Sequence, residues 1–111
     1  PSGAGAKIRR RMTISTHVLD TERGLPAAGV RVELWADGAL IGSAATDADG
    51  RVADLSEGQS LGPGRYRLVF SDPPSRFFRR VELEIDLDDA DRHYHVPLLV
   101  SPYSCASYRG S

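Results

Sequence analysis

The sequence has almost no cysteine, no long apolar run and nearly no net charge. Cys105 is the only cysteine, which excludes a disulfide within the chain, and no cysteines and histidines have the spacing of a zinc site. No apolar stretch approaches the roughly 20 residues that a membrane-spanning helix needs. The formal net charge of -1 argues against a nucleic-acid-binding protein, which is normally distinctly basic. The remaining composition, 41% hydrophobic and 26% charged, is that of a globular domain.

The length of 111 residues fits one domain. A domain of this size buries a single core but does not easily enclose a deep pocket. An interface between copies of the chain is therefore a natural place for a ligand site.

The first eleven residues differ in composition from the rest. Small residues lead into a basic run at 7–11, and residues 12–17 after it are not the apolar stretch that a secretory signal requires. We therefore expect residues 1–11 to be a flexible N-terminal extension or tag, residues 12–111 to form the domain, and the protein to be cytoplasmic.

Apolar and polar residues alternate with a period of two along most of the chain. This pattern predicts strands with one buried and one solvated face, at 13–19, 30–35, 40–46, 51–54, 65–71, 81–88 and 94–100. Several short strands at this spacing, without a long helical period, predict an all-β fold: a two-sheet antiparallel sandwich. One short helix fits at residues 74–78, because proline suits a first helical turn.

Asp-Gly pairs at 37–38 and 49–50 favour tight hairpins, because both residue types tolerate a positive φ. The segment 47–50 also has some likeness to a calcium loop. It lacks the later ligands and the distal glutamate of an EF-hand, so we interpret it as turn chemistry.

Three residues have side chains suited to acid–base or anion chemistry. His17 shares a strand face with Ser15 and Leu19, and His95 shares one with His93, Pro97 and Leu99. A sandwich can place its first and penultimate strands side by side or across a subunit interface, which makes the two histidines a candidate pair. Arg51 begins a strand and offers a fixed positive fork for a carbonyl oxygen or an oxyanion. A nearby guanidinium also disfavours protonation of a histidine, which leaves a neutral imidazole as a base.

Other reactive or aromatic side chains have plainer interpretations. Nothing near Cys105 indicates a depressed thiol pKa, so we interpret it as a packing residue. Trp35 and the pair Phe77 and Phe78 are interpreted as core or interface residues.

Three segments of the chain together resemble a known family. They are 14–20 (ISTHVLD), 46–51 (TDADGR) and the stretch from 95–102 (HVPLLVSP) to the final Tyr-Arg-Gly-Ser at 108–111. The chain resembles the 5-hydroxyisourate hydrolases, the transthyretin-related enzymes of urate breakdown, over about positions 12 to 111. The terminal Tyr-Arg-Gly-Ser is the specific part, because hormone-carrying transthyretins do not have it.

The resemblance implies a prealbumin-like fold, a function and a set of site residues. The domain at 12–111 would be a transthyretin-like hydrolase, assembled as a homotetramer (a dimer of dimers) with its sites in clefts where dimers meet. It would open 5-hydroxyisourate to 2-oxo-4-hydroxy-4-carboxy-5-ureidoimidazoline without a cofactor or metal. The family's motifs place catalytic residues at His17, Arg51, His95 and Ser111, and substrate-binding residues at Tyr108, Arg109 and Gly110.

The roles that follow are hypotheses. His17 and His95 would position and deprotonate water and return the proton, in an order that the sequence leaves open. Arg51 would orient the substrate and stabilise its carbonyl oxygen, while Ser111 and the terminal carboxylate would help to form the cleft. Two alternatives stand beside this interpretation: a small-ligand carrier like transthyretin, and an accessory β-sandwich module without catalysis.

Overall fold

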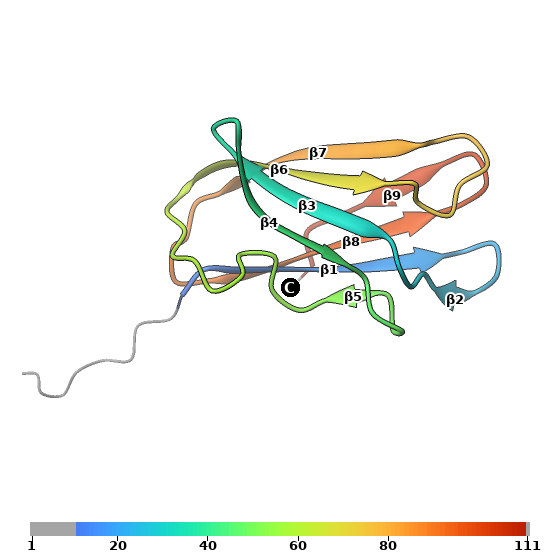
Figure 1. Ribbon diagram of the computed structural model, residues 1–111, viewed down its shortest axis with the longest axis horizontal. Coiled ribbons are helices and arrows are strands. Elements are labelled where there is room, and N and C mark those ends of the chain that lie inside the picture. Colours follow the sequence, from blue (N-terminus) through green and yellow to red (C-terminus); the bar gives the residue numbers. More distant parts are fainter. Residues whose placement is uncertain (1–10, 111) are drawn as a thin grey trace, which may run out of the picture.

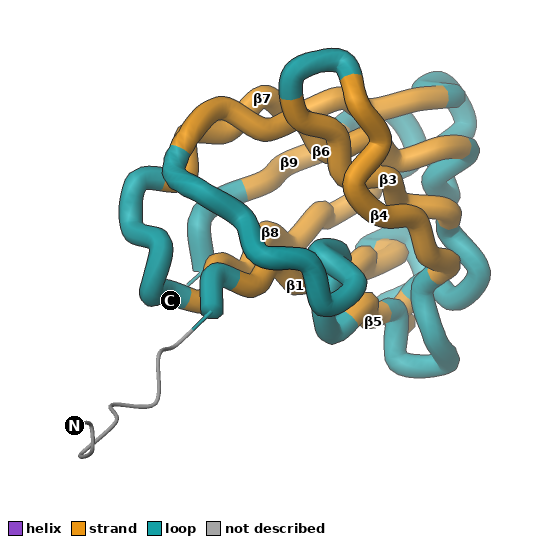
Figure 2. The backbone as a smooth tube through the Cα atoms, turned by 60° about the vertical axis from the view of Figure 1, so that its left-hand side comes forward, coloured by secondary structure: helices purple, strands orange, loops and turns teal. Residues whose placement is uncertain are grey.

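The computed structural model describes residues 11–110 and contains nine strands in that range (Figure 1). Figure 2 shows strands and loops only. The expected extension falls almost wholly on residues outside the described range. No helix in residues 11–110 is long and apolar enough to cross a membrane. The strands are β1 Thr13–Asp20, β2 Leu25–Pro26, β3 Arg31–Ala36, β4 Ala39–Ala45, β5 Arg51–Val52, β6 Gly64–Ser71, β7 Arg80–Leu87, β8 His93–Val100 and β9 Cys105–Ser107.

The strands form two layers, which confirms the predicted two-sheet sandwich. One sheet has the order β4-β3-β6-β7, and the other has the order β2-β1-β8-β9 with β5 also paired to β1 (Figure 1). Neighbouring strands are antiparallel except β1 and β8, which run parallel. These two strands lie far apart in the chain, so no hairpin constrains their relative direction.

The core lies between the sheets and follows the period-two pattern of the sequence. Every second residue of β6 and β8 is buried, as are Val32 and Leu34 of β3 and the inward face of β1. Burial of each large apolar side chain in this core stabilises the folded state by about 1.5–3 kcal/mol relative to exposure to water. The largest members include Ile14, Val18, Val32, Leu34, Leu68, Phe70, Tyr94, Leu98 and Val100.

The two Asp-Gly turns have different outcomes. Asp37 and Gly38 have φ values of 51° and 75° and join β3 to β4 as a two-residue hairpin, as predicted. The prediction of a hairpin at 49–50 is wrong, because β4 and β5 belong to different sheets. The turn itself is tight: the Asp47 carboxylate accepts the N–H groups of Asp49 and Arg51, each at 2.9 Å.

The predicted short helix at 74–78 is also wrong. The Ser75 hydroxyl accepts the N–H groups of Phe77 at 3.0 Å and Phe78 at 2.8 Å, much as a helix-capping serine does. The chain does not continue into a helix, because it re-enters a strand at Arg80 to pair with β6. The connection is a capped bend.

Cys105 and the aromatic residues occupy contrasting places. Cys105 is partly buried against the core, and burial raises the pKa of its thiol, which agrees with a packing role. Phe77 is 66% exposed, and half-buried Trp35 lies beside the Arg67 guanidinium at 5.5 Å. Phe77 and Trp35 are therefore not core residues, and whether they lie at an interface stays a prediction.

Candidate active site

The parallel pairing of β1 and β8 brings two polar rows together on the outer surface of the five-stranded sheet. In this register Thr13 lies opposite His93, and Ser15 lies opposite His95. Residues that face each other across two strands project to the same side of a sheet. The alternate residues of both strands, among them Ile14 and Tyr94, point into the core. The histidines therefore lie on the side away from the core.

Arg51 reaches the same surface through β5. The β1–β5 register pairs His17 with Arg51. Gly50 makes this pairing close: its carbonyl accepts the Val18 N–H at 2.7 Å, and a Cβ on Gly50 would lie 2.5 Å from the Val18 carbonyl oxygen. We call the outer surface that carries His17, Arg51, His93 and His95 the histidine face.

Gly110 closes one side of His95. The two residues form an isolated antiparallel bridge, in which the Gly110 N–H donates to the His95 carbonyl at 2.7 Å. A Cβ on Gly110 would lie 2.8 Å from Cδ2 of the His95 ring. Only glycine leaves the ring its present position, which agrees with the predicted close approach at this residue.

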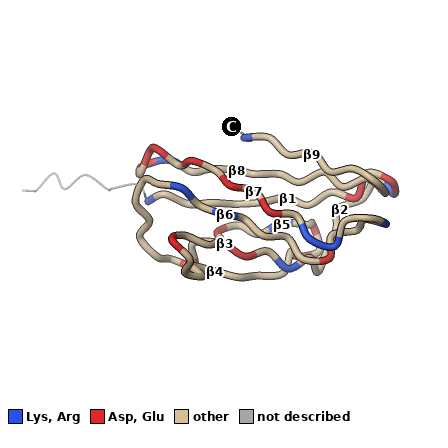
Figure 3. The backbone as a smooth tube through the Cα atoms, turned by 90° about the horizontal axis from the view of Figure 1, so that it is seen from above, with Lys and Arg blue, Asp and Glu red and all other residues tan. Residues whose placement is uncertain are grey.

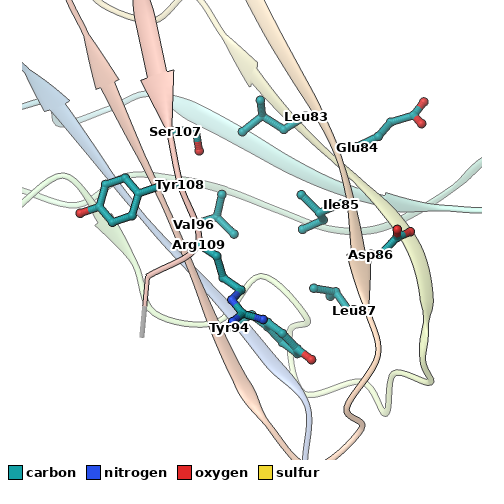
Figure 4. Close-up of a pocket in the computed structure, with 10 residues that line it drawn as sticks. All are labelled: Leu83, Glu84, Ile85, Asp86, Leu87, Tyr94, Val96, Ser107, Tyr108 and Arg109. Carbon is teal, nitrogen blue, oxygen red and sulfur yellow. The ribbon is translucent and has the colours of Figure 1, made fainter.

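The structure separates the other members of the terminal motif. The β8–β9 register, continued past Ser107, places Tyr108 opposite Pro97 on the histidine face and Arg109 opposite Val96 on the core side. Both residues line part of a cleft at the open edge between the sheets, and Figure 4 shows the Arg109 side chain extending toward Tyr94 while the Tyr108 ring points away from it. Arg109 is thus not brought to the histidines of its own chain, and Ser111 lies outside the described residues.

A hydrogen-bonded row joins the histidines of β8 to hydroxyls of β1. Oγ of Ser15 lies 2.8 Å from Nδ1 of His95 and 2.8 Å from Nε2 of His93. Oγ1 of Thr13 lies 2.5 Å from Nδ1 of His93. The sequence alone does not mark Thr13, Ser15 or His93 as site residues. The alternation of apolar and polar residues places all three on the outer faces of β1 and β8. Only the parallel pairing of these strands shows that Thr13 and Ser15 lie next to the histidines.

The electrostatics of the histidine face favour a neutral imidazole. Burial lowers the pKa of His95, and the positive charges of Arg51, His17 and His93 lower it further. Arg51 is exposed, and none of the ion pairs among residues 11–110 includes it. Its guanidinium is therefore available to a ligand.

The arrangement offers a neutral base beside an uncommitted cation. A half-buried imidazole can take a proton from water, and a guanidinium can bind a carbonyl oxygen or a developing oxyanion. Residues 11–110 contain no group of three or more histidine, cysteine, aspartate or glutamate side chains that would hold a metal ion. Hydrolysis at a polarised carbonyl fits these groups.

Comparison with known proteins gives consistent matches. The model of the HIUase/Transthyretin family matches residues 14–110. The protein named 5-hydroxyisourate hydrolase 2 of Rhizobium meliloti (strain 1021) is 42% identical over 114 residues, which cover 88% of this chain and 95% of that protein.

Two solved structures share the fold. The 5-hydroxyisourate hydrolase of Klebsiella pneumoniae superposes with a TM-score of 0.81 at 34% identity, covering 90% of this chain and 99% of that one. Sea bream transthyretin in complex with thyroxine superposes with a TM-score of 0.77 at 28% identity, covering 88% and 94%. One of these structures is a hydrolase and the other is a complex with a hormone, so the fold alone does not decide between hydrolysis and ligand binding.

Proposed function

The chain belongs to the HIUase/Transthyretin family, and on that premise we propose that it is an enzyme, a 5-hydroxyisourate hydrolase of urate degradation. The observation that carries the proposal is the meeting of His17, Arg51 and His95 on one surface from three different strands. Relatives of about 40% identity are named as hydrolases of this substrate.

The proposed reaction opens a cyclic amide with one water molecule. The water oxygen bonds to C6 of 5-hydroxyisourate, and negative charge develops on the C6 oxygen. The N1–C6 bond then breaks, N1 takes a proton, and 2-oxo-4-hydroxy-4-carboxy-5-ureidoimidazoline is released. The step needs a base for the water, a donor for the oxyanion and a proton for the leaving nitrogen.

Three side chains meet these needs in our proposal. His95 is the base, because burial and the neighbouring positive charges lower its pKa and keep it neutral at neutral pH. Arg51 binds the C6 oxygen, an interaction that strengthens as the oxygen becomes negative. His17, opposite Arg51 in the register, orients the water or the leaving nitrogen. These steps involve no metal or organic cofactor.

Residues of the terminal motif form one wall of the proposed site. Gly110 supports the ring of His95, and Tyr108 is 61% exposed on the histidine face, where it can contact substrate. We assign Ser111 the predicted role of hydrogen-bonding substrate or water. The geometry gives less support for direct substrate binding by Arg109, which lines the edge cleft of its own chain.

We further propose that the chain assembles as a homotetramer, a dimer of dimers, in the cytoplasm. The open edge between β7 and β9 leaves an apolar cleft lined by Leu83, Ile85, Leu87 and Val96 (Figure 4). Among residues 11–110 no further strand pairs with the outer edges of β7 and β9, and strand edges exposed beside an apolar cleft favour association of two copies. The exposed Arg51 and Tyr108 and half-buried His17 and His95 leave the histidine face open to a second pair. A site shared between dimers would give the substrate the enclosure that one chain lacks.

The alternative of a small-ligand carrier has one supporting observation, the likeness to sea bream transthyretin with thyroxine. A carrier of an aromatic hormone needs an apolar lining more than an acid–base set. Three histidines share one face with Arg51, which takes part in no ion pair within residues 11–110, and this combination favours the hydrolase.

The decisive experiment follows the ultraviolet absorbance of freshly prepared 5-hydroxyisourate. We expect its loss to be much faster with the protein than in buffer alone. Absorbance loss at the buffer rate, with saturable binding of the compound, would support a carrier and refute the hydrolase.

A further inference from the structure

A row of four polar side chains runs along the histidine face from the start of β1 to His95. The row is Thr13, His93, Ser15 and His95, linked by contacts of 2.5, 2.8 and 2.8 Å. Both ring nitrogens of His93 are engaged, one by each hydroxyl. Ser15 is 9% exposed, so water does not readily replace it. Its hydroxyl is the only described hydrogen-bond partner of the His95 ring within residues 11–110.

The Ser15 hydroxyl has a single proton, so it can donate a hydrogen bond to only one of the two histidines at a time. If Ser15 donates to Nε2 of His93, its oxygen can accept the N–H at Nδ1 of His95. If Ser15 donates instead to Nδ1 of His95, the neutral ring must carry its proton on Nε2. The hydrogen bond at one ring nitrogen thus decides which tautomer of the histidine is present.

Only one of these directions suits a base. A neutral imidazole with its proton on Nδ1 has a free lone pair on Nε2, the nitrogen that no described hydrogen bond engages in residues 11–110. The opposite tautomer has an N–H at Nε2 and cannot take a proton from water there.

We propose that Ser15 and His93 are positioning residues that hold the proton of neutral His95 on Nδ1 and leave Nε2 as the basic nitrogen. Ser15 accepts from Nδ1 of His95 and donates to Nε2 of His93, while Nδ1 of His93 donates to Thr13. This inference rests on the proposed hydrolase function.

The proton balance of the step is simple. Nε2 of His95 takes one proton from the attacking water and forms an imidazolium. The proton on Nδ1 stays in its hydrogen bond to Ser15, which strengthens while the ring is charged. The Nε2 proton then passes to the leaving N1, and the ring returns to its starting tautomer. Neither Ser15 nor His93 touches the substrate.

The positive groups around His95 destabilise its protonated form, the imidazolium. A hydrogen-bond acceptor at Nδ1 stabilises that form, and Ser15 supplies it. His17 on β1, Arg51 on β5 and His93 on β8 all lower the pKa of His95 when they carry positive charge, in addition to the effect of burial. Tyr108 lies on the same face, opposite Pro97 in the register continued from Ser107 to Gly110. Among residues 11–110, the Ser15 oxygen is the described acceptor that offsets them at Nδ1.

The first test reads the tautomer directly and needs no turnover. Long-range ¹⁵N–¹H spectra distinguish a proton on Nδ1 from one on Nε2, and the chain has only three histidines to assign. We expect His95 to carry its proton on Nδ1 in the native protein and in Ser15→Thr, which keeps the hydroxyl. In Ser15→Ala we expect the proton to move to Nε2. A native His95 protonated on Nε2 overturns the proposal.

A matched control is Ser43→Ala. The Ser43 hydroxyl is buried on β4 in the other sheet and has no hydrogen-bond partner among the described residues. This variant removes the same atom and should leave the His95 tautomer unchanged. His93→Gln is a second variant of the row, because its amide can still hydrogen-bond to Ser15 but does not titrate. It should keep the proton on Nδ1.

The second test is kinetic. Ser15→Ala should lower kcat about tenfold, less than the roughly 10²-fold or greater loss of an acid–base residue, with little change in KM. The acidic limb of its kcat/KM profile should move to lower pH, because the imidazolium loses its acceptor. Ser15→Thr should restore both. A limb that moves to higher pH overturns the proposal, as does an unchanged kcat in a folded Ser15→Ala protein.

The two tests separate this proposal from the proposed function. A native protein that does not hydrolyse 5-hydroxyisourate refutes the hydrolase, whatever the tautomer of His95. A native protein that is active with His95 protonated on Nε2 refutes the positioning role alone.

Discussion

The two outer faces of the sandwich use arginine in opposite ways. On the four-stranded sheet, Arg65 pairs with Asp86 at 3.2 Å, and Glu82 pairs with Arg67 at 3.4 Å and Arg80 at 2.8 Å. Basic residues of β6 and acidic residues of β7 lie side by side there (Figure 3). On the histidine face, Arg51 has no such partner within residues 11–110, and the histidines contact hydroxyls instead of carboxylates.

The difference shows that a positive charge outside an ion pair and beside titratable groups, and not the amount of charge, marks the candidate site. The two charges of an ion pair on an exposed sheet surface largely cancel each other's field, and each such pair contributes little to the free energy of folding. Positive charges without partners act instead on the nearest titratable group, and here they lower the pKa of His95 together with burial. A perturbed pKa beside an unpaired cation is typical of a functional site.

Replacing His95 should have the largest effect on turnover. His95→Asn keeps a polar side chain but removes the base, and we expect kcat/KM for 5-hydroxyisourate to fall about 10²- to 10⁴-fold. The assay is the initial rate of ultraviolet loss at neutral pH. The circular dichroism spectrum and melting temperature should change little, because the ring lies outside the core. A folded His95→Asn protein with native turnover would contradict the assignment.

Alternation along the strands predicted both sheets but not every element. All seven predicted strands have a counterpart in the structure, although the one predicted at 51–54 keeps only Arg51–Val52. The six longer strands were predictable because apolar and polar residues alternate along them. Strands β2 and β9 have only two and three residues and are too short and too exposed to produce such a pattern. The helix at 74–78 was wrong because a proline and a serine cap suit a bend as well as a helix start.

The sequence predicted some residues of the candidate site but not their arrangement. Motif resemblance identified His17, Arg51, His95 and Gly110, and the structure brings all four to one face. The contact of Ser15 with two histidines depends on the register of two strands that are distant in the chain. The alternation along each strand fixes which face its residues occupy, but not which residue of β1 lies opposite which residue of β8.

Arg51→Gln should have the next largest effect. Loss of the guanidinium removes the proposed oxyanion partner, and we expect kcat to fall about 10²- to 10³-fold. A second consequence concerns pH. Arg51 lowers the pKa of His95, so its removal raises that pKa and moves the acidic limb of kcat/KM to higher pH. A rate profile across acidic and neutral pH measures both, and a limb that moves to lower pH would refute the coupling.

Gly110→Ala should have a smaller effect that depends on geometry alone. The new Cβ would lie 2.8 Å from Cδ2 of His95, so the ring must shift by a few tenths of an ångström. We expect kcat to fall about tenfold, because acid–base catalysis depends on the placement of the base. The matched control is Gly62→Ala, where a Cβ meets no atom within 4 Å. Equal rates in the two variants would show that the position of His95 is not critical.

Replacing an arginine of the ion pairs on the four-stranded sheet should have the smallest effect. Arg65→Gln removes the same charge as Arg51→Gln, but from an ion pair whose side chains are 72% and 74% exposed. We expect the free energy of unfolding to fall by about 0.5 kcal/mol or less, measured by urea denaturation. Turnover and its pH profile should stay native, because Arg65 is not among the charges that lower the pKa of His95. If Arg65→Gln moved the acidic limb as far as Arg51→Gln does, net charge and not the local absence of a partner would govern the site.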